Sequence, residues 1–208
     1  MARYTGPVCR MCRAEQRKLM LKGARCMSDK CPLNKKRGAP GKDPKTRAGK
    51  QSEYGLQLSE KQKLRRMYGL LEKQFRLTFE RAQRTKGITG EVLLQLLESR
   101  LDNLVYRLGF APTRDAARQL VSHRHIVLDG KVANIPSIIV KPGQVVGVRE
   151  RSKALEVIEN SLSGFNHAKY PWLEYDAASK SGKYLHIPER ADIPENIKEQ
   201  LIVELYSK

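Results

Sequence analysis

The spacing of the apolar residues changes near His125, and this change limits the possible folds more than any other feature of the sequence. Before it, apolar residues recur every three or four positions through Gly90–Leu108, which predicts one long amphipathic helix. After it come short apolar runs such as Ile126–Leu128, which is followed at once by a tight turn at Asp129-Gly130. Helices followed by short strands in hairpins predict an α+β fold.

Residues 99–148 are expected to form one compact unit of two helices and a small antiparallel sheet. Gly109 ends the long helix, and Thr113 is expected to cap a second, shorter helix whose Ala117 and Val121 face inward. The two helices together have a helix–turn–helix outline. The strands predicted in this unit are Ile126–Leu128, Lys131–Ala133, Ile138–Val140 and Val145–Val148.

Further helices and one hairpin are predicted on both sides of this unit. Ser59 begins a capping box for a helix that ends at Tyr68-Gly69. A second helix at 71–85 places Phe75 and Phe79 on one face. The remaining predicted elements are a helix at 152–162, a hairpin of Trp172–Tyr175 with Lys183–Ile187, and a short C-terminal helix at 197–206.

The charge of the chain is strongly positive and concentrated near its start. Of 208 residues, 40 are Lys or Arg and 22 are Asp or Glu, a net charge of +18. The first 50 residues hold 15 Lys and Arg but only three Asp and Glu. Such an excess attracts polyanions, so nucleic acid is the leading partner and an anionic membrane the second. No apolar run can span a bilayer and the first residues do not resemble a signal peptide, so we expect an intracellular protein without a membrane partner.

All four cysteines lie in the basic N-terminal arm, residues 1–45, at Cys9, Cys12, Cys26 and Cys31. Their paired spacing predicts a tetrahedral metal site, because each pair can place two thiolates on one side of an ion. The arm has too few apolar residues to fold by itself, and a bound metal would supply the missing free energy. Zinc is the expected metal, with an iron–sulfur cluster or four unliganded cysteines as the alternatives. Four thiolates leave no open coordination position, so a catalytic zinc is not expected.

The second helix of the 99–148 unit carries a candidate nucleic-acid surface. Guanidinium groups suit phosphate because their planar fork donates two hydrogen bonds at once, and folded RNA is recognised largely through its backbone and unstacked bases. A solvated helix face is the alternative for the cations, and metal binding is the less favoured alternative for the histidines. The residues of this surface are Arg107, Arg114, Arg118, Gln119, His123, Arg124 and His125, with Lys131 on the following strand.

Further cations lie in the arm, in the linker and in the helices at 61–86. The linker at 33–52 is rich in Gly, Pro and Lys and is expected to run extended over a partner. Tyr68 either stacks on a base or, as is more usual next to a helix end, packs within the fold. The candidate RNA contacts of this group are Arg3, Arg10, Arg13, Lys35, Lys36, Arg37, Arg47, Lys61, Lys63, Arg65, Arg66, Tyr68 and Arg76.

Several stretches of the sequence resemble a known family. Ser99–Phe110 and Ala117–Ile126 are similar to the RNA-binding domain first named for ribosomal protein four of the bacterial small subunit. Arg3–Glu15, Lys61–Gly69 and Gln200–Lys208 are similar to that ribosomal protein itself. The resemblance therefore covers essentially the whole chain.

This resemblance implies a structural protein of the cytoplasmic small ribosomal subunit, a primary binder of its RNA that nucleates assembly of the 5′ domain. Implied partners are neighbouring small-subunit ribosomal proteins and messenger RNA, near whose path into the ribosome the family lies. Some members also repress translation of their own operon. The implied layout is the arm at 1–45, a helical domain at 46–98 completed by about 190–208, and an RNA-binding domain inserted at 99–189.

Two other classes of protein fit parts of the sequence. An RNA-modifying enzyme or a synthetase can carry such an RNA-binding domain, but residues 149–208 are too few and too plain for a catalytic domain. A zinc-dependent regulator would prefer duplex DNA and usually bind as a symmetric dimer, for which the sequence has no heptads. The sequence pairs no nucleophile with a base, so we expect RNA binding without catalysis and without a small-molecule substrate.

Overall fold

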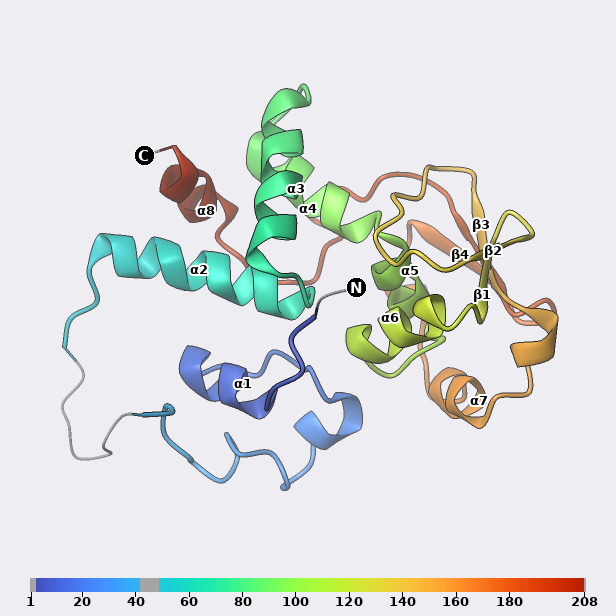
Figure 1. Ribbon diagram of the computed structural model, residues 1–208, viewed down its shortest axis with the longest axis horizontal. Helices are drawn as coiled ribbons and strands as arrows, with labels where there is room; N and C mark the ends of the chain where they lie inside the picture. Colours follow the sequence, from blue (N-terminus) through green and yellow to red (C-terminus); the bar gives the residue numbers. More distant parts are fainter. Residues whose placement is uncertain (1–2, 42–48, 208) are drawn as a thin grey trace. The chain divides into compact units, whose positions relative to one another are not determined.

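The computed structural model describes residues 3–41 and 49–207 (Figure 1), and the candidate RNA contact Arg47 lies outside these ranges. The chain divides into two compact units, Met1–Gly90 with Glu195–Lys208, and Glu91–Pro194. Within the described ranges, every helix is too short or too polar to cross a membrane. Helices combined with one antiparallel sheet confirm the expected α+β fold.

The first unit is helical. The predicted start of its longest helix at Ser59 is wrong, because Ser52 is the cap and its side chain accepts a hydrogen bond from the N–H of Gly55 (3.2 Å). Ser59 instead donates to the carboxylate of Glu15 (3.1 Å). The elements of this unit are α1 (Cys9–Glu15), the 3-10 helix η1 (Gly23–Cys26), α2 (Glu53–Met67), α3 (Glu72–Arg84) and α8 (Glu199–Tyr206).

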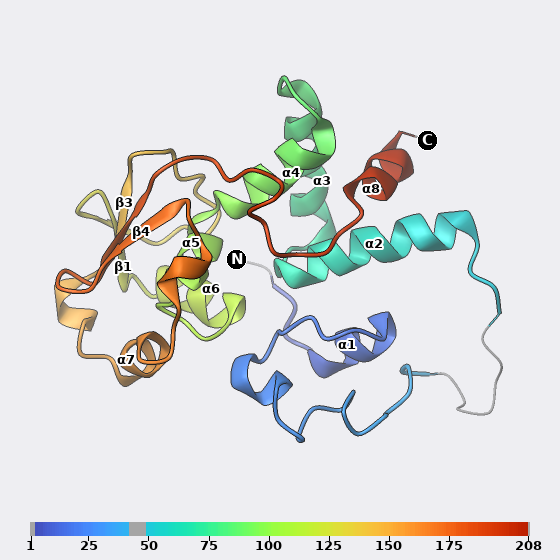
Figure 2. The same ribbon diagram turned by 180° about the vertical axis from the view of Figure 1, so that it is seen from behind.

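The C-terminal helix α8 completes the core of the first unit. It lies alongside α2 and α3 in both views (Figures 1 and 2). Phe75 and Phe79, on the predicted apolar face of α3, are almost fully buried. The ring of Tyr206 stacks on that of Phe79 with 4.4 Å between centroids, and its hydroxyl donates to Glu72 (3.1 Å). Burial, and then the neighbouring carboxylate, raise the pKa of Tyr206, so this hydroxyl keeps its proton at neutral pH.

The second unit combines helices with a five-stranded antiparallel sheet of order β2-β1-β3-β5-β4. The predicted turn at Asp129-Gly130 is confirmed, since Leu128 pairs with Lys131 across it. β3 joins the two hairpins, pairing with β1 on one side and β5 on the other. The elements are α4 (Thr89–Glu98), α5 (Leu101–Arg107), α6 (Arg114–Ser122), β1 (Ile126–Leu128), β2 (Lys131–Ala133), β3 (Val145–Val148), η2 (Glu150–Ser152), α7 (Glu156–Leu162), η3 (His167–Lys169), β4 (Leu173–Asp176) and β5 (Ser181–Tyr184).

Two of the predicted strands need correction. The strand expected at Ile138–Val140 does not form in the described structure, where Ile139 makes only an isolated bridge with Arg100. The second strand of the last hairpin is Ser181–Tyr184 rather than Lys183–Ile187, because it pairs with β4 across a shorter turn. The sheet therefore includes only segments whose backbone groups pair with a neighbouring strand over several consecutive residues.

The single long helix predicted at Gly90–Leu108 is also wrong. It divides into α4 and α5 at Ser99 and Arg100, where Arg100 has an extended backbone with φ −71° and ψ 140°. At this break the N–H of Leu101 donates to the carbonyl of Ile138 (2.8 Å), which replaces a bond within the helix. The apolar spacing continues through the break because both helices bury their apolar faces.

Gly182 on β5 lies where the sheet packs closely against Leu108. A Cβ atom at this position would be 2.2 Å from Leu108 Cδ2. We expect Gly182→Ala to overpack the core and lower the free energy of unfolding by about 1–3 kcal/mol, measured by urea denaturation. Gly164→Ala is the matched control, because a Cβ there meets nothing within 4 Å. Equal urea midpoints for the two variants would contradict close packing at Gly182.

Candidate RNA-binding surface

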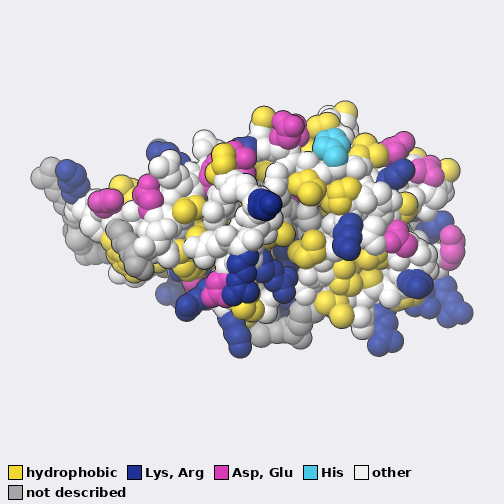
Figure 3. All heavy atoms as spheres, turned by 90° about the horizontal axis from the view of Figure 1, so that it is seen from above, with side chains coloured by type: hydrophobic (Ala, Val, Ile, Leu, Met, Phe, Trp, Pro, Cys, Tyr) yellow, Lys and Arg dark blue, Asp and Glu magenta, His cyan; other side chains and the backbone are white. Residues whose placement is uncertain are grey.

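Lys and Arg side chains gather in several places on the face drawn in Figure 3, with Asp and Glu side chains among them. Helix α6 carries several of the predicted contacts. As predicted, Thr113 caps this helix by accepting a hydrogen bond from the N–H of Ala116 (3.2 Å), and Ala117 and Val121 are buried. The predicted contacts that remain exposed or half-buried on α6 and at its end are Arg114, Arg118, Gln119, His123, Arg124 and His125.

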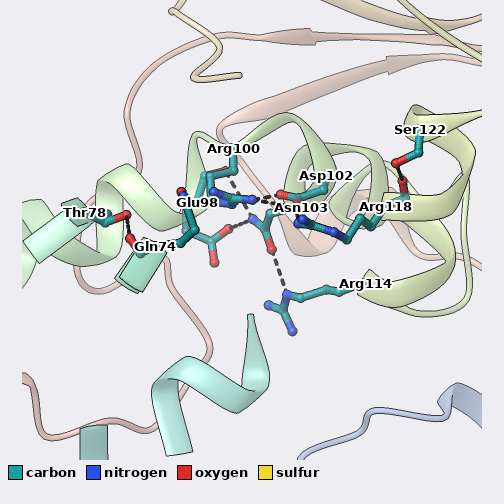
Figure 4. A network of polar contacts seen from close by, with 9 residues as sticks. All are labelled: Gln74, Thr78, Glu98, Arg100, Asp102, Asn103, Arg114, Arg118 and Ser122. Atoms are coloured by element: carbon teal, nitrogen blue, oxygen red, sulfur yellow. Dashed lines mark hydrogen bonds and ion pairs between the residues drawn. The ribbon is translucent and has the colours of Figure 1, made fainter. Parts of the chain in front are cut away.

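Asp102 on α5 holds two arginines from inside the fold (Figure 4). Its carboxylate accepts two hydrogen bonds from Arg100, at 3.0 and 2.7 Å, and one from Arg118 Nη1 at 3.0 Å. Asp102 is only 5% exposed, so water screens these interactions weakly. The carboxylate therefore fixes the direction of the long Arg118 side chain on α6.

Asn103 holds the second arginine of α6 (Figure 4). Its carboxamide oxygen accepts a hydrogen bond from Arg114 Nε (2.8 Å), while its nitrogen donates to the side chain of Glu98 (2.7 Å). The guanidinium of Arg114 also lies over the ring of Tyr106, with 4.7 Å between its carbon and the centroid. Arg114 is thus held by a hydrogen bond and by a cation–π contact.

Arg107, a predicted RNA contact, belongs instead to the interior of the second unit. Its side chain is 2% exposed and donates two hydrogen bonds to the carboxylate of Glu98, at 3.0 and 2.6 Å. A third goes to the hydroxyl of Tyr170 (3.1 Å), over whose ring the guanidinium lies. The prediction for Arg107 is corrected because this cation neutralises a buried carboxylate and offers no surface to a ligand.

These contacts form a layer of polar side chains beneath α6. Asp102 and Asn103 orient the two arginines of α6, and the pair of Glu98 with Arg107 lies below them. A guanidinium that is oriented before binding loses less conformational freedom when it meets its partner. The surface is therefore suited to direct, bidentate contacts with phosphate oxygens. Reasoning from the sequence found the arginines of α6 but missed the residues that orient them.

Three predicted contacts of the first unit are buried, and two of them make polar contacts within this unit. Lys61 donates to Glu72 on α3 (2.7 Å). Lys63 donates to Glu60 (3.1 Å) and to the backbone carbonyl of Asn196 (2.5 Å). Tyr68 is also buried, which agrees with packing rather than base stacking. The RNA role predicted for Lys61, Lys63 and Tyr68 is corrected because none of them presents its side chain at the surface.

The other cations of α2 and α3 are at least partly accessible. Arg65 and Arg66 are half-buried and pair with Glu72 and Glu15. Arg76 is 71% exposed in its side chain and pairs with Glu80 one turn along α3 (3.1 Å). An exposed pair of this kind is weak, so Arg76 can exchange its carboxylate for a phosphate.

The remaining predicted contacts lie at the surface, with two exceptions. Arg13 is half-buried and donates to the carbonyl of Gly38 (3.2 Å). His125 is half-buried, and its Nδ1 lies 2.9 Å from the hydroxyl of Ser152, which gives the ring a structural partner. The exposed members are Arg3, Arg10, Lys35, Lys36, Arg37 and Lys131.

The four cysteines lie near enough to influence one another electrostatically, but they do not form a compact set of ligands in the described structure. Cys12, Cys26 and Cys31 are buried and Cys9 is half-buried. Burial raises the pKa of the Cys12 thiol; the N–H of Leu19 opposes this, and the other three cysteines raise it further. No group of three or more His, Cys, Asp or Glu in residues 3–41 and 49–207 is placed to hold a metal ion. Thiolates are typical zinc ligands, so the four side chains are chemically suited to this metal. In the described structure they are not grouped closely enough to form a metal site.

Comparisons with known proteins find relatives along the whole chain. A family model described as "Ribosomal protein S4/S9 N-terminal domain" matches residues 3–98, and one described as "S4 domain" matches residues 99–146. A small ribosomal subunit protein uS4 of Parabacteroides distasonis is 67% identical over 208 residues, which is 100% of both chains. Proteins of the same name from Phocaeicola vulgatus and Bacteroides thetaiotaomicron are 66% and 67% identical, also over 100% of both chains. The similarity therefore includes α6 and the residues beneath it.

Proposed function

Because the chain belongs to the family of small ribosomal subunit protein uS4, we propose that it is a structural, non-enzymatic constituent of the cytoplasmic small ribosomal subunit and binds its RNA. The α6 surface is the observation that carries this proposal. There Arg114 and Arg118 are oriented by Asn103 and Asp102, an arrangement suited to the phosphates of a folded RNA. The exposed cations of the arm add attraction that does not depend on sequence.

The experiment that tests this proposal is a titration of the protein with small-subunit ribosomal RNA over a series of salt concentrations, with duplex DNA as competitor. We expect tight RNA binding that survives excess DNA, with a salt slope that reports the number of phosphate contacts. Equal or stronger binding to duplex DNA would sink the proposal and favour a DNA-binding regulator.

The family resemblance supports a finer proposal about the place of the protein in assembly. We propose that the chain binds early to the 5′ domain of the RNA, beside other small-subunit proteins. It would lie near the path by which messenger RNA enters the ribosome. We also propose that it represses translation of its own operon. Adding the purified protein to a translation reaction that carries its operon leader should reduce synthesis. Unchanged synthesis would remove the repressor role without affecting the structural one.

We also propose that Cys9, Cys12, Cys26 and Cys31 bind one metal centre, with zinc expected and an iron–sulfur cluster as the alternative. The support is chemical: four soft donors lie in an arm that is otherwise poor in apolar residues. A metal would cross-link segments of the arm that few apolar contacts hold. Lys22 donates its backbone N–H to Cys26 Sγ (3.3 Å), which fixes the position of this sulfur in the arm.

Removing the metal is expected to loosen the arm and leave the second unit intact. After treatment with a chelator, tryptic cleavage in residues 1–41 should become faster, while the unfolding of the second unit, followed by Trp172 fluorescence, stays unchanged. Elemental analysis should find about one zinc per chain, and visible absorbance would instead identify an iron–sulfur cluster. Metal-free protein with the same cleavage rate before and after chelation would contradict the proposal.

A further inference from the structure

Arg37, an exposed residue of the arm, lines two separate hollows. One backbone turn is closed by a hydrogen bond from the N–H of Arg37 to the carbonyl of Pro32 (3.0 Å). Arg13 on α1 ties this turn to the helix by donating to the carbonyl of Gly38 (3.2 Å). The cations that line the hollows are Arg10, Arg13 and Arg37 in one of about 510 Å³, and Lys18, Lys36 and Arg37 in the other of about 470 Å³.

The charge of the two hollows is entirely positive. Neither lining includes an Asp or a Glu. In the described part of the chain, none of the ion pairs involves Arg10, Lys36 or Arg37, whereas Lys61 and Arg66 on α2 both pair with carboxylates. Cations without neighbouring carboxylates produce a positive potential that attracts an anion.

The backbone at the second hollow is held in an uncommon conformation. Gln16 and Lys36, which both line it, have φ values of 55° and 51°, in the left-handed region that residues other than glycine rarely adopt. Such conformations persist where the surrounding structure enforces them, and they gather at ligand sites. Gln16 adopts this conformation at the end of α1 and Lys36 adopts it in the turn before Arg37, so the chain changes direction at two points in the lining of this hollow.

We infer that the two hollows bind two phosphate groups and that Arg37 contacts both. The guanidinium has five N–H donors in a planar fork, enough to serve an oxygen-bearing anion on each side. Arg10 and Arg13 complete the first subsite, and Lys18 and Lys36 complete the second. The inference rests on the proposed function for the source of the phosphates, which are neighbouring phosphates of the ribosomal RNA backbone. Free inorganic phosphate offers the same chemistry and must be distinguished by experiment.

The test compares salt slopes of RNA binding for variants of the full-length protein. Arg37→Ala removes one positive charge, so we expect it to reduce the magnitude of the slope of log affinity against log salt by roughly 0.7–0.9. Arg10→Ala and Lys36→Ala should each reduce it by the same amount, roughly 0.7–0.9. At a fixed salt concentration Arg37→Ala should lose more affinity than either of them, because it removes hydrogen bonds to both phosphates. Arg37→Lys keeps the charge but loses the fork, so its slope should match the wild type while its affinity at fixed salt falls. Arg25→Ala is the matched control, because this exposed cation of the arm lines neither hollow.

Two outcomes would overturn the inference. One is an Arg37→Ala slope no lower than that of Arg25→Ala, with tryptic cleavage showing both arms equally folded. The other is that millimolar inorganic phosphate shifts the backbone N–H NMR signals of residues 33–38 to saturation, while the affinity for RNA measured in the same phosphate stays unchanged. Failure of the proposed function would give a different result. The wild-type protein would then show no preference for ribosomal RNA over duplex DNA, whether or not Arg37→Ala changed the salt slope.

Discussion

Replacing Glu98 with alanine is expected to lower the free energy of unfolding of the second unit by about 3–5 kcal/mol, the range seen when one partner of a buried ion pair is removed. Glu98 is fully buried and accepts two hydrogen bonds from Arg107 and one from Asn103. Its removal takes away the carboxylate that accepts two hydrogen bonds from the buried Arg107 guanidinium. Urea denaturation measures the change, with the fluorescence of Trp172, the only tryptophan of the chain, as a probe inside this unit.

Two controls separate the buried pair from a general effect of losing a carboxylate. Glu150→Ala removes a carboxylate that is 84% exposed and pairs with Lys153 (2.6 Å), so its effect should stay below about 1 kcal/mol. The double replacement Glu98→Leu with Arg107→Met removes both charges and should recover most of the stability lost in Glu98→Ala. A Glu98→Ala protein that unfolds at the wild-type urea concentration would show that Arg107 has another way to be neutralised.

The elements that could be predicted from the sequence are those with local causes. The α6 helix is confirmed because Thr113 caps it and its apolar residues follow a helical period within nine residues. The break between α4 and α5 could not be predicted in this way. It depends on a hydrogen bond from Leu101 to Ile138, a partner far along the chain, while the local apolar period continues unchanged. The pairing of β3 with β5 is equally nonlocal.

In the candidate site, too, the features with local causes could be predicted and those that depend on distant partners could not. Exposed cations such as Arg118 could be predicted, because a polar residue opposite an apolar helix face is expected to lie near the surface. The burial of Arg107 and Lys61 could not, since it depends on Glu98 and Glu72, which tertiary structure brings to them. One signal was nevertheless present: Glu98, Asp102 and Asn103 lie among closely spaced leucines in the segment 90–108. Polar residues inside such a segment are buried only when they have partners.

Replacing Arg114 and Arg118 together with alanine is expected to weaken binding to small-subunit ribosomal RNA on the order of fiftyfold at about 0.1 M salt. The estimate assumes one phosphate contact for each guanidinium, and the salt slope should fall by roughly 1.4–1.8. Titrations of both proteins at several salt concentrations measure it, and Trp172 fluorescence confirms that the variant is folded. Arg151→Ala with Lys183→Ala is the matched control, because it removes two exposed cations from the same unit. An equal loss in the control would mean that α6 contributes only net charge.

Asn103 gives a sharper test of the same surface, because its effect on binding is expected to pass through Arg114. Asn103→Ala removes the acceptor of the Arg114 Nε hydrogen bond and leaves every cation of α6 in place. If orientation matters, this variant should lose RNA affinity although its charge is unchanged. In a protein that already carries Arg114→Ala, the same replacement should then have no further effect, since the side chain it orients is absent. Equal losses in both backgrounds would instead assign Asn103 a purely structural role and leave the two arginines acting as unoriented charges.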